Sequence, residues 1–390
     1  MSETQAKLNL NVILFTLSRA VINTSFRVVY PFLPVFAQGL GVDAASLGMA
    51  LSIRSFLGVF IPFLATVADT HTRKSGILLG LGLFTAGSAV TGLLPQFWGF
   101  IIGTSLVLLG NGVFIPSLNA YLGDHVPYER RGRILAITEL SWALAFILGI
   151  PVVQLLIQSN SWVTPFFYFT IIGILFFILF ALVLPSQAIA KSGSNTIWRN
   201  MGRVFNTWPA LAGLLMGILS TGANEMVNLI FGVWIGDQFG LNFAALTVAS
   251  MVIGFSELGG EIFSSLWLDK FGKRRMILVF LGLNSLVALI LPLTNNALPW
   301  ALAGLGVFYI SFEIVLISTL TLMTEILPAA RATILAMTVA AFSLGRMLGD
   351  LIAPELYGFG FWATCLGAVV LNLLAAGFLT QVRVLWTGPE

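Results

Sequence analysis

Leu268-Asp269-Lys270-Phe271-Gly272-Lys273-Arg274-Arg275 lies between two long apolar runs and carries five of the 35 Asp, Glu, Lys and Arg residues of the chain. A weaker copy, Ala68-Asp69-Thr70-His71-Thr72-Arg73-Lys74, lies 200 residues earlier. Each copy has an acid at the end of an apolar run, a tight turn, and a basic cluster before the next run. The repeat indicates that one half-protein is used twice along the chain.

The composition excludes an ordinary soluble domain. Hydrophobic residues make up 58% of the chain and charged residues 9%, whereas soluble domains are about 25% charged. A polytopic membrane protein has this composition. A single cysteine, Cys365, excludes a disulfide framework, and two histidines are too few for a histidine metal site or a catalytic triad. We therefore expect no metal, no cofactor and no enzyme activity.

Twelve runs are long and apolar enough to cross a bilayer, which takes about 20 residues. The first is expected to be a retained helix rather than a signal peptide. The one polar linker, 185–207, separates an N-terminal bundle of six spans (1–184) from a C-terminal bundle of six (208–390). The predicted spans are 11–36, 45–68, 75–94, 97–123, 134–157, 163–184, 208–236, 243–268, 276–293, 298–324, 333–356 and 360–382.

The basic residues predict the orientation. Fifteen of the 19 Lys and Arg lie outside the spans, and all fifteen fall on one side. Cytoplasmic loops carry such an excess, so both termini and the linker are expected in the cytoplasm of a cell whose plasma membrane holds the protein. The basic residues thus report orientation and not nucleic-acid binding. The opposite loops, near Asp43, Gln96, Ser159, Asp237, Asn295 and Gly358, contain no Lys or Arg.

A second pair of segments supports the repeat. Asp124-His125-Val126-Pro127, followed by Arg130-Arg131, corresponds to Glu325-Ile326-Leu327-Pro328, followed by Arg331. Two parallel six-helix repeats are an architecture of secondary transporters. No Gly-rich loop ending in Lys and Ser or Thr is present, which argues against direct drive by ATP.

On these residues the chain resembles the major facilitator superfamily, over essentially its whole length, and in particular the drug exporters of that family. The family carries a G-x-x-x-D-x-x-G-R-R/K signature between helices 2 and 3 and often a relic of it between helices 8 and 9. The resemblance implies an all-α fold of 12 transmembrane helices in two pseudo-symmetric six-helix bundles. It also implies a cytoplasmic gate at Asp69, Arg73, Lys74, Arg131, Asp269, Gly272, Lys273 and Arg274.

The sequence departs from the pattern of proton-driven drug exporters at two places. Leu106 stands where those exporters have an arginine in helix 4, four residues before a glycine. Of their glycine-rich G-P-x-x-G-G element in helix 5, Gly149 and Pro151 remain. Both departures weaken a transfer of the drug/proton antiport mechanism to this chain.

Charged residues within the spans are the candidate substrate and proton sites. A charge at the bilayer centre costs roughly 2.5–3.5 kcal/mol, so it usually faces a cavity or a partner. We expect ten charged residues within the spans to be buried. Their formal charges sum to +2 in the N-terminal half and to −4 in the C-terminal half. With polar and aromatic neighbours on the same helices, the candidates are Arg19, Asn23, Arg27, Arg54, Glu139, Trp142, Asn224, Glu225, Asn228, Glu257, Glu261, Glu313, Arg346 and Asp350.

Helical spacing adds detail to these candidates. Arg19, Asn23 and Arg27 step by four and share one helix face. Glu257 and Glu261 are one turn apart, where two carboxylates repel, so one of them is expected to titrate high. Arg346 and Asp350 are also one turn apart and could pair with each other. Six tryptophans near span ends are interpreted as interfacial anchors rather than ligand contacts: Trp98, Trp162, Trp208, Trp234, Trp300 and Trp362.

The leading hypothesis is a monomeric secondary transporter that exports a small amphipathic or cationic compound by alternating access, driven by protons. A protonatable glutamate in the C-terminal half would couple proton movement to export of the compound. Alternatively, the buried charged residues form fixed salt bridges between the two halves. A second hypothesis is a carrier of an anionic or zwitterionic metabolite held by Arg27 and Arg54. An intramembrane sensor or enzyme is a remote alternative, because no nucleophile–base pair supports it.

Overall fold

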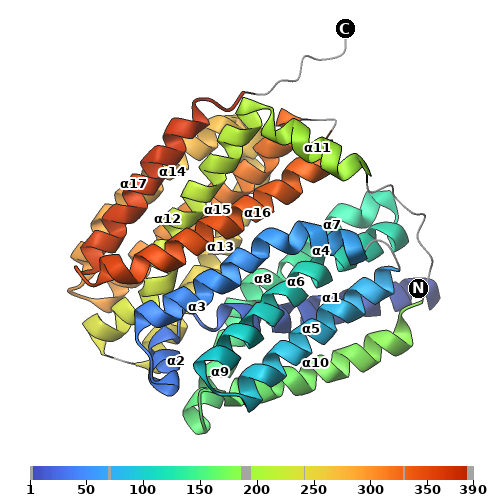
Figure 1. Ribbon diagram of the computed structural model, residues 1–390, viewed down its shortest axis with the longest axis horizontal. Helices are drawn as coiled ribbons and strands as arrows, with labels where there is room; N and C mark the ends of the chain where they lie inside the picture. The colour runs from blue at the N-terminus through green and yellow to red at the C-terminus, as the bar shows by residue number, and fades with distance from the viewer. Residues whose placement is uncertain (1–2, 69–71, 186–194, 241, 328–329, 384–390) are drawn as a thin grey trace. The chain divides into compact units, whose positions relative to one another are not determined.

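The computed structural model describes residues 3–68, 72–185, 195–240, 242–327 and 330–383, and every regular element in these ranges is a helix (Figure 1). The helices group into two compact units, each with its own internal packing. Unit 1 comprises Met1–Val42 and Phe63–Lys191, and unit 2 comprises Asp43–Pro62 and Ser192–Glu390.

In unit 1, α5 lies against α6 and α10, while α1 packs on α6, α8 and a π-helical turn, η2. The elements that lie wholly or largely in this unit are α1 (Glu3–Arg27), α2 (Leu33–Leu40), α4 (Ile61–Ala68), α5 (Arg73–Leu93), α6 (Phe97–His125), α7 (Tyr128–Glu139), α8 (Ser141–Leu144), η2 (Ala145–Gly149), α9 (Ile150–Ser159) and α10 (Thr164–Val183).

In unit 2, α12 packs against α16 and α17, α15 against α13 and α14, and α3 against α16, as Figure 1 shows for the last pair. The elements of this unit are α3 (Ala44–Leu57), η1 (Gly58–Phe60), α11 (Asn195–Phe205), α12 (Trp208–Phe239), α13 (Phe243–Phe271), α14 (Lys273–Ile290), η3 (Leu291–Thr294), α15 (Leu298–Ile326), α16 (Arg331–Tyr357) and α17 (Phe361–Leu379).

Eleven helical segments in the described ranges are long and apolar enough to cross a membrane, and they match the second to twelfth predicted spans within a few residues. The first predicted span, 11–36, is wrong as a continuous helix. α1 ends at Arg27, residues 28–32 form turns, and α2 starts at Leu33. Pro31 and Pro34 explain the break, because proline has no N–H to donate within a helix.

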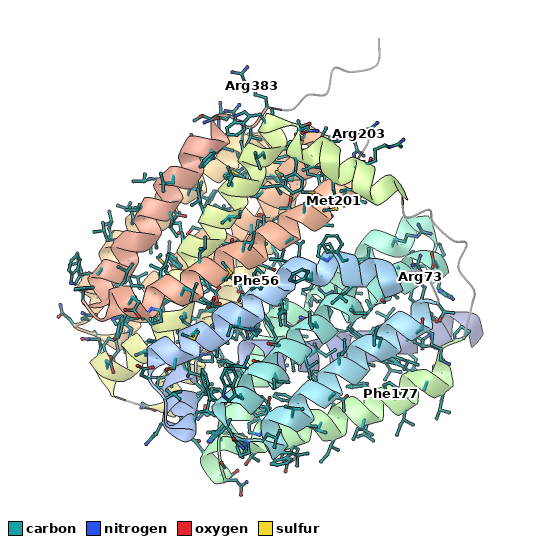
Figure 2. All side chains as sticks on the ribbon, in the orientation of Figure 1. Phe56, Arg73, Phe177, Met201, Arg203 and Arg383 are labelled. Atoms are coloured by element: carbon teal, nitrogen blue, oxygen red, sulfur yellow. The ribbon has the colours of Figure 1, made fainter. Side chains whose placement is uncertain are left out.

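Burial distinguishes inner from outer helices. In the most apolar window of α12, 83% of the residues are buried, against 22% in α10. Large apolar side chains such as Phe177, labelled in Figure 2, and Leu182 are exposed along α10. This surface suits hydrocarbon rather than water, and it places α10 on the outside of its unit.

The fifth predicted span, 134–157, is a helical segment interrupted by a π-helical turn. Its α-helical hydrogen bonds give way to the π-helical turn η2 immediately before Pro151, whose ring nitrogen cannot donate to the preceding turn. Gly149 ends this turn against α1: a Cβ there would lie 2.1 Å from Oγ1 of Thr24. The glycine–proline pair therefore permits the close approach of η2 to α1.

The predicted linker, 185–207, is not wholly irregular. It contains α11, which belongs to unit 2. Val204 is fully buried in the core of that unit, whereas Arg203 is exposed (Figure 2). The polar composition of the segment concealed an amphipathic helix, whose apolar side docks on a bundle.

Segment 43–62, which the sequence places in the N-terminal bundle, clusters with unit 2 because α3 packs on α16. A Cβ at Gly48 would lie 2.5 Å from the carbonyl oxygen of Asp350. The sequence boundaries at 184 and 208 stay a prediction. Gly345 brings α16 close to α12, since a Cβ there would lie 2.0 Å from Oγ1 of Thr221.

Candidate functional site

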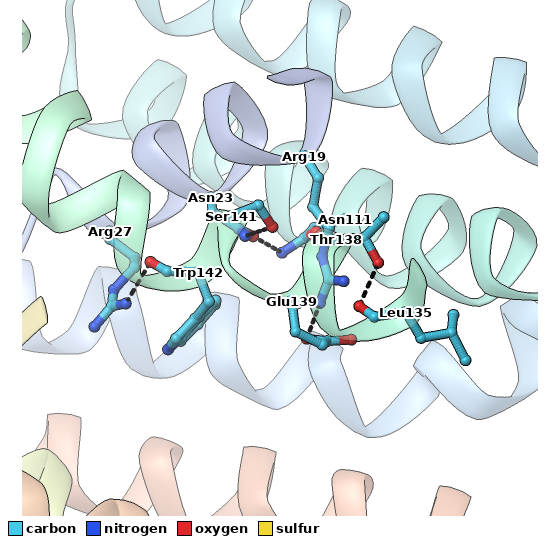
Figure 3. A network of polar contacts seen from close by, with 9 residues as sticks. All are labelled: Arg19, Asn23, Arg27, Asn111, Leu135, Thr138, Glu139, Ser141 and Trp142. Carbon is cyan, nitrogen blue, oxygen red and sulfur yellow. Dashed lines mark hydrogen bonds and ion pairs between the residues drawn. The ribbon is translucent and has the colours of Figure 1, made fainter. Parts of the chain in front are cut away.

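The first polar cluster lies inside unit 1, where three residues on one face of α1 meet the α7–α8 region (Figure 3). Nη2 of Arg19 donates to Oε2 of Glu139 at 2.5 Å. The Arg19 side chain is 5% exposed and that of Glu139 is 45% exposed. Nε and Nη1 of Arg19 have no hydrogen-bond partner among the described residues. A buried cation is thus paired on one side only.

A chain of amides continues the cluster toward α6. Nδ2 of Asn23 donates to Oγ of Ser141 at 3.4 Å, and Nδ2 of Asn111 donates to Oδ1 of Asn23 at 3.5 Å (Figure 3). Asn23 was a predicted site residue, but Asn111 and Ser141 were not. Their signal was available in the sequence, since each is a polar residue within an apolar span. Helix α6 therefore contributes to the cluster without any charged residue.

Arg27 is held by aromatic rings. Its guanidinium carbon lies 4.3 Å from the ring centroid of Trp142 and 3.5 Å from that of Phe146, and Nη1 donates to the carbonyl oxygen of Trp142 at 3.1 Å. Cation–π contacts of this kind stabilise a desolvated arginine by about 2 kcal/mol. Trp142 therefore packs against a protein cation, and the predicted common face of Arg19, Asn23 and Arg27 is confirmed.

The second cluster lies inside unit 2 and is acidic. Oγ of Ser55 on α3 donates to Oδ2 of Asp350 on α16 at 2.8 Å. Glu225 on α12 and Arg54 on α3 both lie close enough to Asp350 to act electrostatically on its carboxyl group. Asp350, Glu225 and Arg54 are each at most 1% exposed. Two carboxyl groups and one guanidinium thus share a site that water does not reach.

Glu225 is anchored from its own helix. Nδ2 of Asn228 lies 3.2 Å from each carboxylate oxygen of Glu225, and the Tyr309 hydroxyl donates to Oδ1 of Asn228 at 2.8 Å. Glu225 and Asn228 therefore lie on the same face of α12. Tyr309 on α15 was missed, because a tyrosine in an apolar span has no signal that separates it from a packing residue. Asn224, next to Glu225, is buried, and its Oδ1 has no partner among the described residues.

Three further carboxylates, Glu257, Glu261 and Glu313, lie on α13 and α15 near a contact between these two helices. A Cβ at Gly260 would lie 2.7 Å from Cβ of Glu313, so the two helices touch there. Glu257 and Glu261 flank this glycine on α13. Glu257 and Glu313 are both 6% exposed, while Glu261 is partly buried. The predicted high titration of one member of the Glu257–Glu261 pair stays a prediction.

Several expectations about these charges are wrong. Glu139, Glu261 and Arg346 are only partly buried, because each lies on a helix face that its unit does not fully cover. Arg346 and Asp350 form no ion pair among the described residues; Ser55 takes that place at the carboxylate. With α3 in unit 2, the charges within spans divide differently from the prediction. Unit 1 holds two arginines and one carboxylate, formally +1, and unit 2 holds five carboxylates and two arginines, formally −3.

The predicted gate residues make contacts that repeat between the units. In unit 1, Nε of Arg73 pairs with Asp124 at 3.1 Å. In unit 2, Nζ of Lys273 pairs with Glu325 and lies 3.8 Å from Asp269. Arg73 and Lys273 are 200 positions apart, and Asp124 and Glu325 are 201 apart. The sequence repeat thus persists as a repeated ion pair.

A second pair of contacts obeys the same spacing. Nζ of Lys74 donates to the carbonyl oxygen of Ala181 at 2.6 Å, and Nη2 of Arg274 donates to that of Thr380 at 3.1 Å. Both acceptors lie at helix C-termini, where backbone carbonyls lack helical partners and attract cations. In each unit the basic cluster therefore ties neighbouring helix ends together.

The remaining gate residues differ in what they contact. Gly272 has φ of +82°, which explains why glycine occupies this turn. The Asp269 side chain is 93% exposed, so Glu325 rather than Asp269 is the main partner of Lys273. Nε of Arg131 donates to the carbonyl oxygen of Val126 at 2.9 Å. Asp69 lies outside the described residues.

The tryptophans at the span ends are not all alike. Trp98, Trp208, Trp300 and Trp362 are each more than half exposed, as expected of interfacial anchors. Trp234 is a correction: it is fully buried, stacks on the ring of Phe361 at a centroid distance of 4.2 Å, and donates from Nε1 to Asn295. A position near a span end therefore does not ensure contact with the membrane interface.

Many apolar spans with buried charges in their interior define this chain as a multi-pass membrane transporter. The sequence model of the Major Facilitator Superfamily matches residues 15–350. The chain belongs to that family, whose members are transporters and not enzymes.

Individual relatives are distant but cover most of the chain. The uncharacterized MFS-type transporter YwfA of Bacillus subtilis is 25% identical over 91% of this chain and 87% of its own length. The quinolone resistance protein NorA of Staphylococcus aureus is 22% identical over 85% of each chain.

Solved structures of the same fold include the nucleoside transporter NupG, with a TM-score of 0.81, 15% identity, and coverage of 96% of this chain and 100% of that one. A bacterial homologue of the lysosomal transporter Spinster gives a TM-score of 0.77 at 14% identity over 97% of this chain and 98% of its own. These likenesses confirm the predicted fold.

Proposed function

We propose that this transporter exports small amphipathic or cationic compounds and that protons drive the export. The observation that carries the proposal is the meeting of Glu225 and Asp350 in the interior of unit 2. Two ionised carboxylates in one buried site repel each other, so one of them holds a proton in the resting protein. A proton held this way can leave when the site opens to the other side of the membrane.

The surroundings favour proton exchange over a fixed salt bridge. Asn228 and Ser55 give these carboxyl groups neutral hydrogen-bond donors, which serve the charged form without neutralising it. Arg54 supplies one positive charge for two acids. One cation cannot compensate both, so the charge of the site changes with its proton.

The direction and the substrate class rest on two further points. The −3 balance in the spans of unit 2 attracts cations rather than anions, and NorA, a quinolone resistance protein, is similar to this chain over 85% of its length. We propose transport by alternating access, with the substrate site exposed to one side of the membrane at a time. The protein would act as a monomer in the plasma membrane of a bacterium-like cell, with both termini in the cytoplasm.

Proteoliposomes test the proposal. Purified protein would be reconstituted, given an imposed pH gradient, and screened with cationic dyes. We expect the gradient to drive dye movement by the wild type and not by Glu225→Gln or Asp350→Asn, which keep the shape but fix the charge. Glu355→Gln, an exposed carboxylate on α16, is the matched control and should transport normally. Gradient-driven transport at the wild-type rate in both buried variants would refute the proton role.

A second candidate is a carrier of an anionic or zwitterionic metabolite. The observation that favours it is the one-sided pairing of Arg19, whose Nε and Nη1 are buried without partners among the described residues. Buried guanidinium N–H groups that have no protein acceptor suit an anionic ligand such as a carboxylate or phosphate. The same liposomes would be offered organic anions, and loss of anion uptake in Arg19→Met, with dye transport intact, would favour this candidate.

A further inference from the structure

The end of unit 2 at which α12, η3 and α16 terminate contains a cavity of about 650 Å³. It is distinct from the buried charges described above. Its walls come from the C-terminal end of α12, from η3, and from the turn between α16 and α17. Small-molecule pockets commonly have volumes of about 300–1,000 Å³, so the cavity has room for a ligand.

The lining combines one carboxylate with aromatic rings. Asp237 is exposed, and its Oδ2 accepts a hydrogen bond from the Tyr357 hydroxyl at 2.7 Å. Phe359 is 75% exposed and Trp362 is 59% exposed, and both line the same cavity. The Tyr357 bond holds the carboxylate in place and leaves Oδ1 open to a ligand.

The backbone of the turn fixes the position of these rings. Gly360 has φ of +110°, a conformation that residues with a Cβ rarely adopt, and a Cβ there would lie 3.0 Å from Cδ1 of Trp362. Beneath the turn, Phe361 is fixed by stacking on the buried Trp234. The turn is therefore a rigid support for two exposed rings, and not a loose connection.

The charge of this end selects the ligand. The loops predicted to face away from the cytoplasm contain Asp43 and Asp237 and no Lys or Arg. No protein cation from these loops therefore competes for the Asp237 carboxylate or for the faces of Phe359 and Trp362. Aromatic faces beside a carboxylate are the chemistry that binds alkylated ammonium groups.

We propose that this cavity binds organic monocations, above all those with a methylated ammonium group and an aromatic ring, between Asp237 and the rings of Phe359 and Trp362. The site is peripheral to the buried carboxylates of unit 2. It collects cations at the outer end of the protein, whichever way the transporter moves its substrate. The inference thus goes beyond the proposed function and does not depend on proton coupling.

The test uses a photoreactive diazirine derivative of benzyltrimethylammonium and its neutral carbon isostere, in which a carbon replaces the nitrogen. The full-length protein would be labelled in nanodiscs in about 0.15 M salt, where exposed charges are screened over about 8 Å. Mass spectrometry would locate the label. We expect saturable labelling between Tyr357 and Trp362 by the cation and not by the isostere.

Two variants and a control locate the interaction. Asp237→Asn keeps an acceptor for Tyr357 but removes the charge, and it should weaken the cation's apparent affinity about fivefold, the upper range for an exposed ion pair. Phe359→Leu removes an exposed ring, and this substitution should weaken the apparent affinity for the cation about two- to fivefold. Asp43→Asn removes the same charge from a residue that does not line the cavity, and it should change nothing.

The opposite results overturn the proposal. Equal labelling by the neutral isostere would mean that the rings are only membrane anchors. An Asp237→Asn variant that labels like the wild type, or an Asp43→Asn variant that labels as weakly as Asp237→Asn, would exclude a local role of Asp237. Labelling is measured without a pH gradient, so its outcome is independent of the liposome experiment.

Discussion

The Arg19–Glu139 pair allows a sharp prediction because its two partners differ in exposure. Removing one partner of a fully buried ion pair costs about 3–5 kcal/mol, since the other charge is left uncompensated. Here Arg19 is 5% exposed and Glu139 is 45% exposed. A charge within a span usually faces an aqueous cavity or a partner, so we expect the exposed side of Glu139 to meet water. Water would then solvate an abandoned Glu139 but not an abandoned Arg19. The cost of losing each partner must then be unequal.

Glu139→Leu leaves the buried guanidinium with no partner at any of its three nitrogens among the described residues. We expect it to destabilise the protein by about 2 kcal/mol, below the fully buried value because water reaches this side of the pair. Arg19→Met keeps the apolar stem and leaves a hydrated carboxylate, so it should cost less than about 1 kcal/mol. The double variant should be more stable than Glu139→Leu alone.

Thermal unfolding in detergent, followed by circular dichroism, ranks the four proteins. The expected order of midpoints is wild type, then Arg19→Met and the double variant close together, and Glu139→Leu lowest. The reasoning fails if Arg19→Met is the least stable protein, or if the effects of the two substitutions add in the double variant. Additivity would mean that the two residues do not interact.

Three other outcomes test the helix ends and the π-helical turn. Lys273→Glu and Glu325→Lys should each destabilise by about 0.5–1 kcal/mol, and the double exchange should recover part of it, more in low than in high salt. Gly149→Ala places a Cβ against Thr24 and should cost about 1–3 kcal/mol, as seen by thermal unfolding. Hydrogen bonds from the first turn of α3 hold the pKa of Asp43 below its ordinary value. The ionised Asp43 therefore stabilises the fold fully above the unfolded-state pKa of about 3.9, and this stabilisation is lost as the pH falls through the lower pKa of the folded state. Asp43→Asn should abolish this pH dependence, measured as unfolding midpoints between pH 3 and 7, while keeping the helix cap.

Local features of the sequence were enough to predict most of the membrane-spanning helices. Each span beyond the first was recoverable because a bilayer sets the length and composition of a crossing helix, whatever its neighbours are. The first predicted span is divided between α1 and α2, because Pro31 and Pro34 interrupt the helix within a run that stays apolar. Hydropathy measures transfer to lipid and does not register a missing N–H. The helix α11 was not predicted for a related reason, because its apolar residues are separated by polar ones along the sequence.

The sequence predicted which charged residues belong to the candidate clusters, but it did not predict which residues they pair with. A charged residue within an apolar span is easy to recognise, because placing a charge in the membrane costs free energy. Arg19, Glu225 and Asp350 were therefore identified from the sequence. The neutral members of the clusters were harder to find: Ser55 bonds Asp350, Tyr309 bonds Asn228, and Asn111 bonds Asn23. A hydroxyl or amide costs less than a charge in a membrane helix, so its signal in the sequence is weaker. The pairing of residues far apart in the sequence depends on helix rotation and packing.

The sequence by itself determined the class of protein, the repeat and the charged residues that lie within the spans. It did so because the membrane imposes its constraints on each segment separately. The tertiary structure alone decided that Arg73 and Lys273, 200 positions apart, each bind an acid at the end of another helix. It also decided that Asp350 is bonded to Ser55 rather than to Arg346. Those choices depend on which helix faces meet, and that is settled by packing at close contacts such as Gly345 against Thr221.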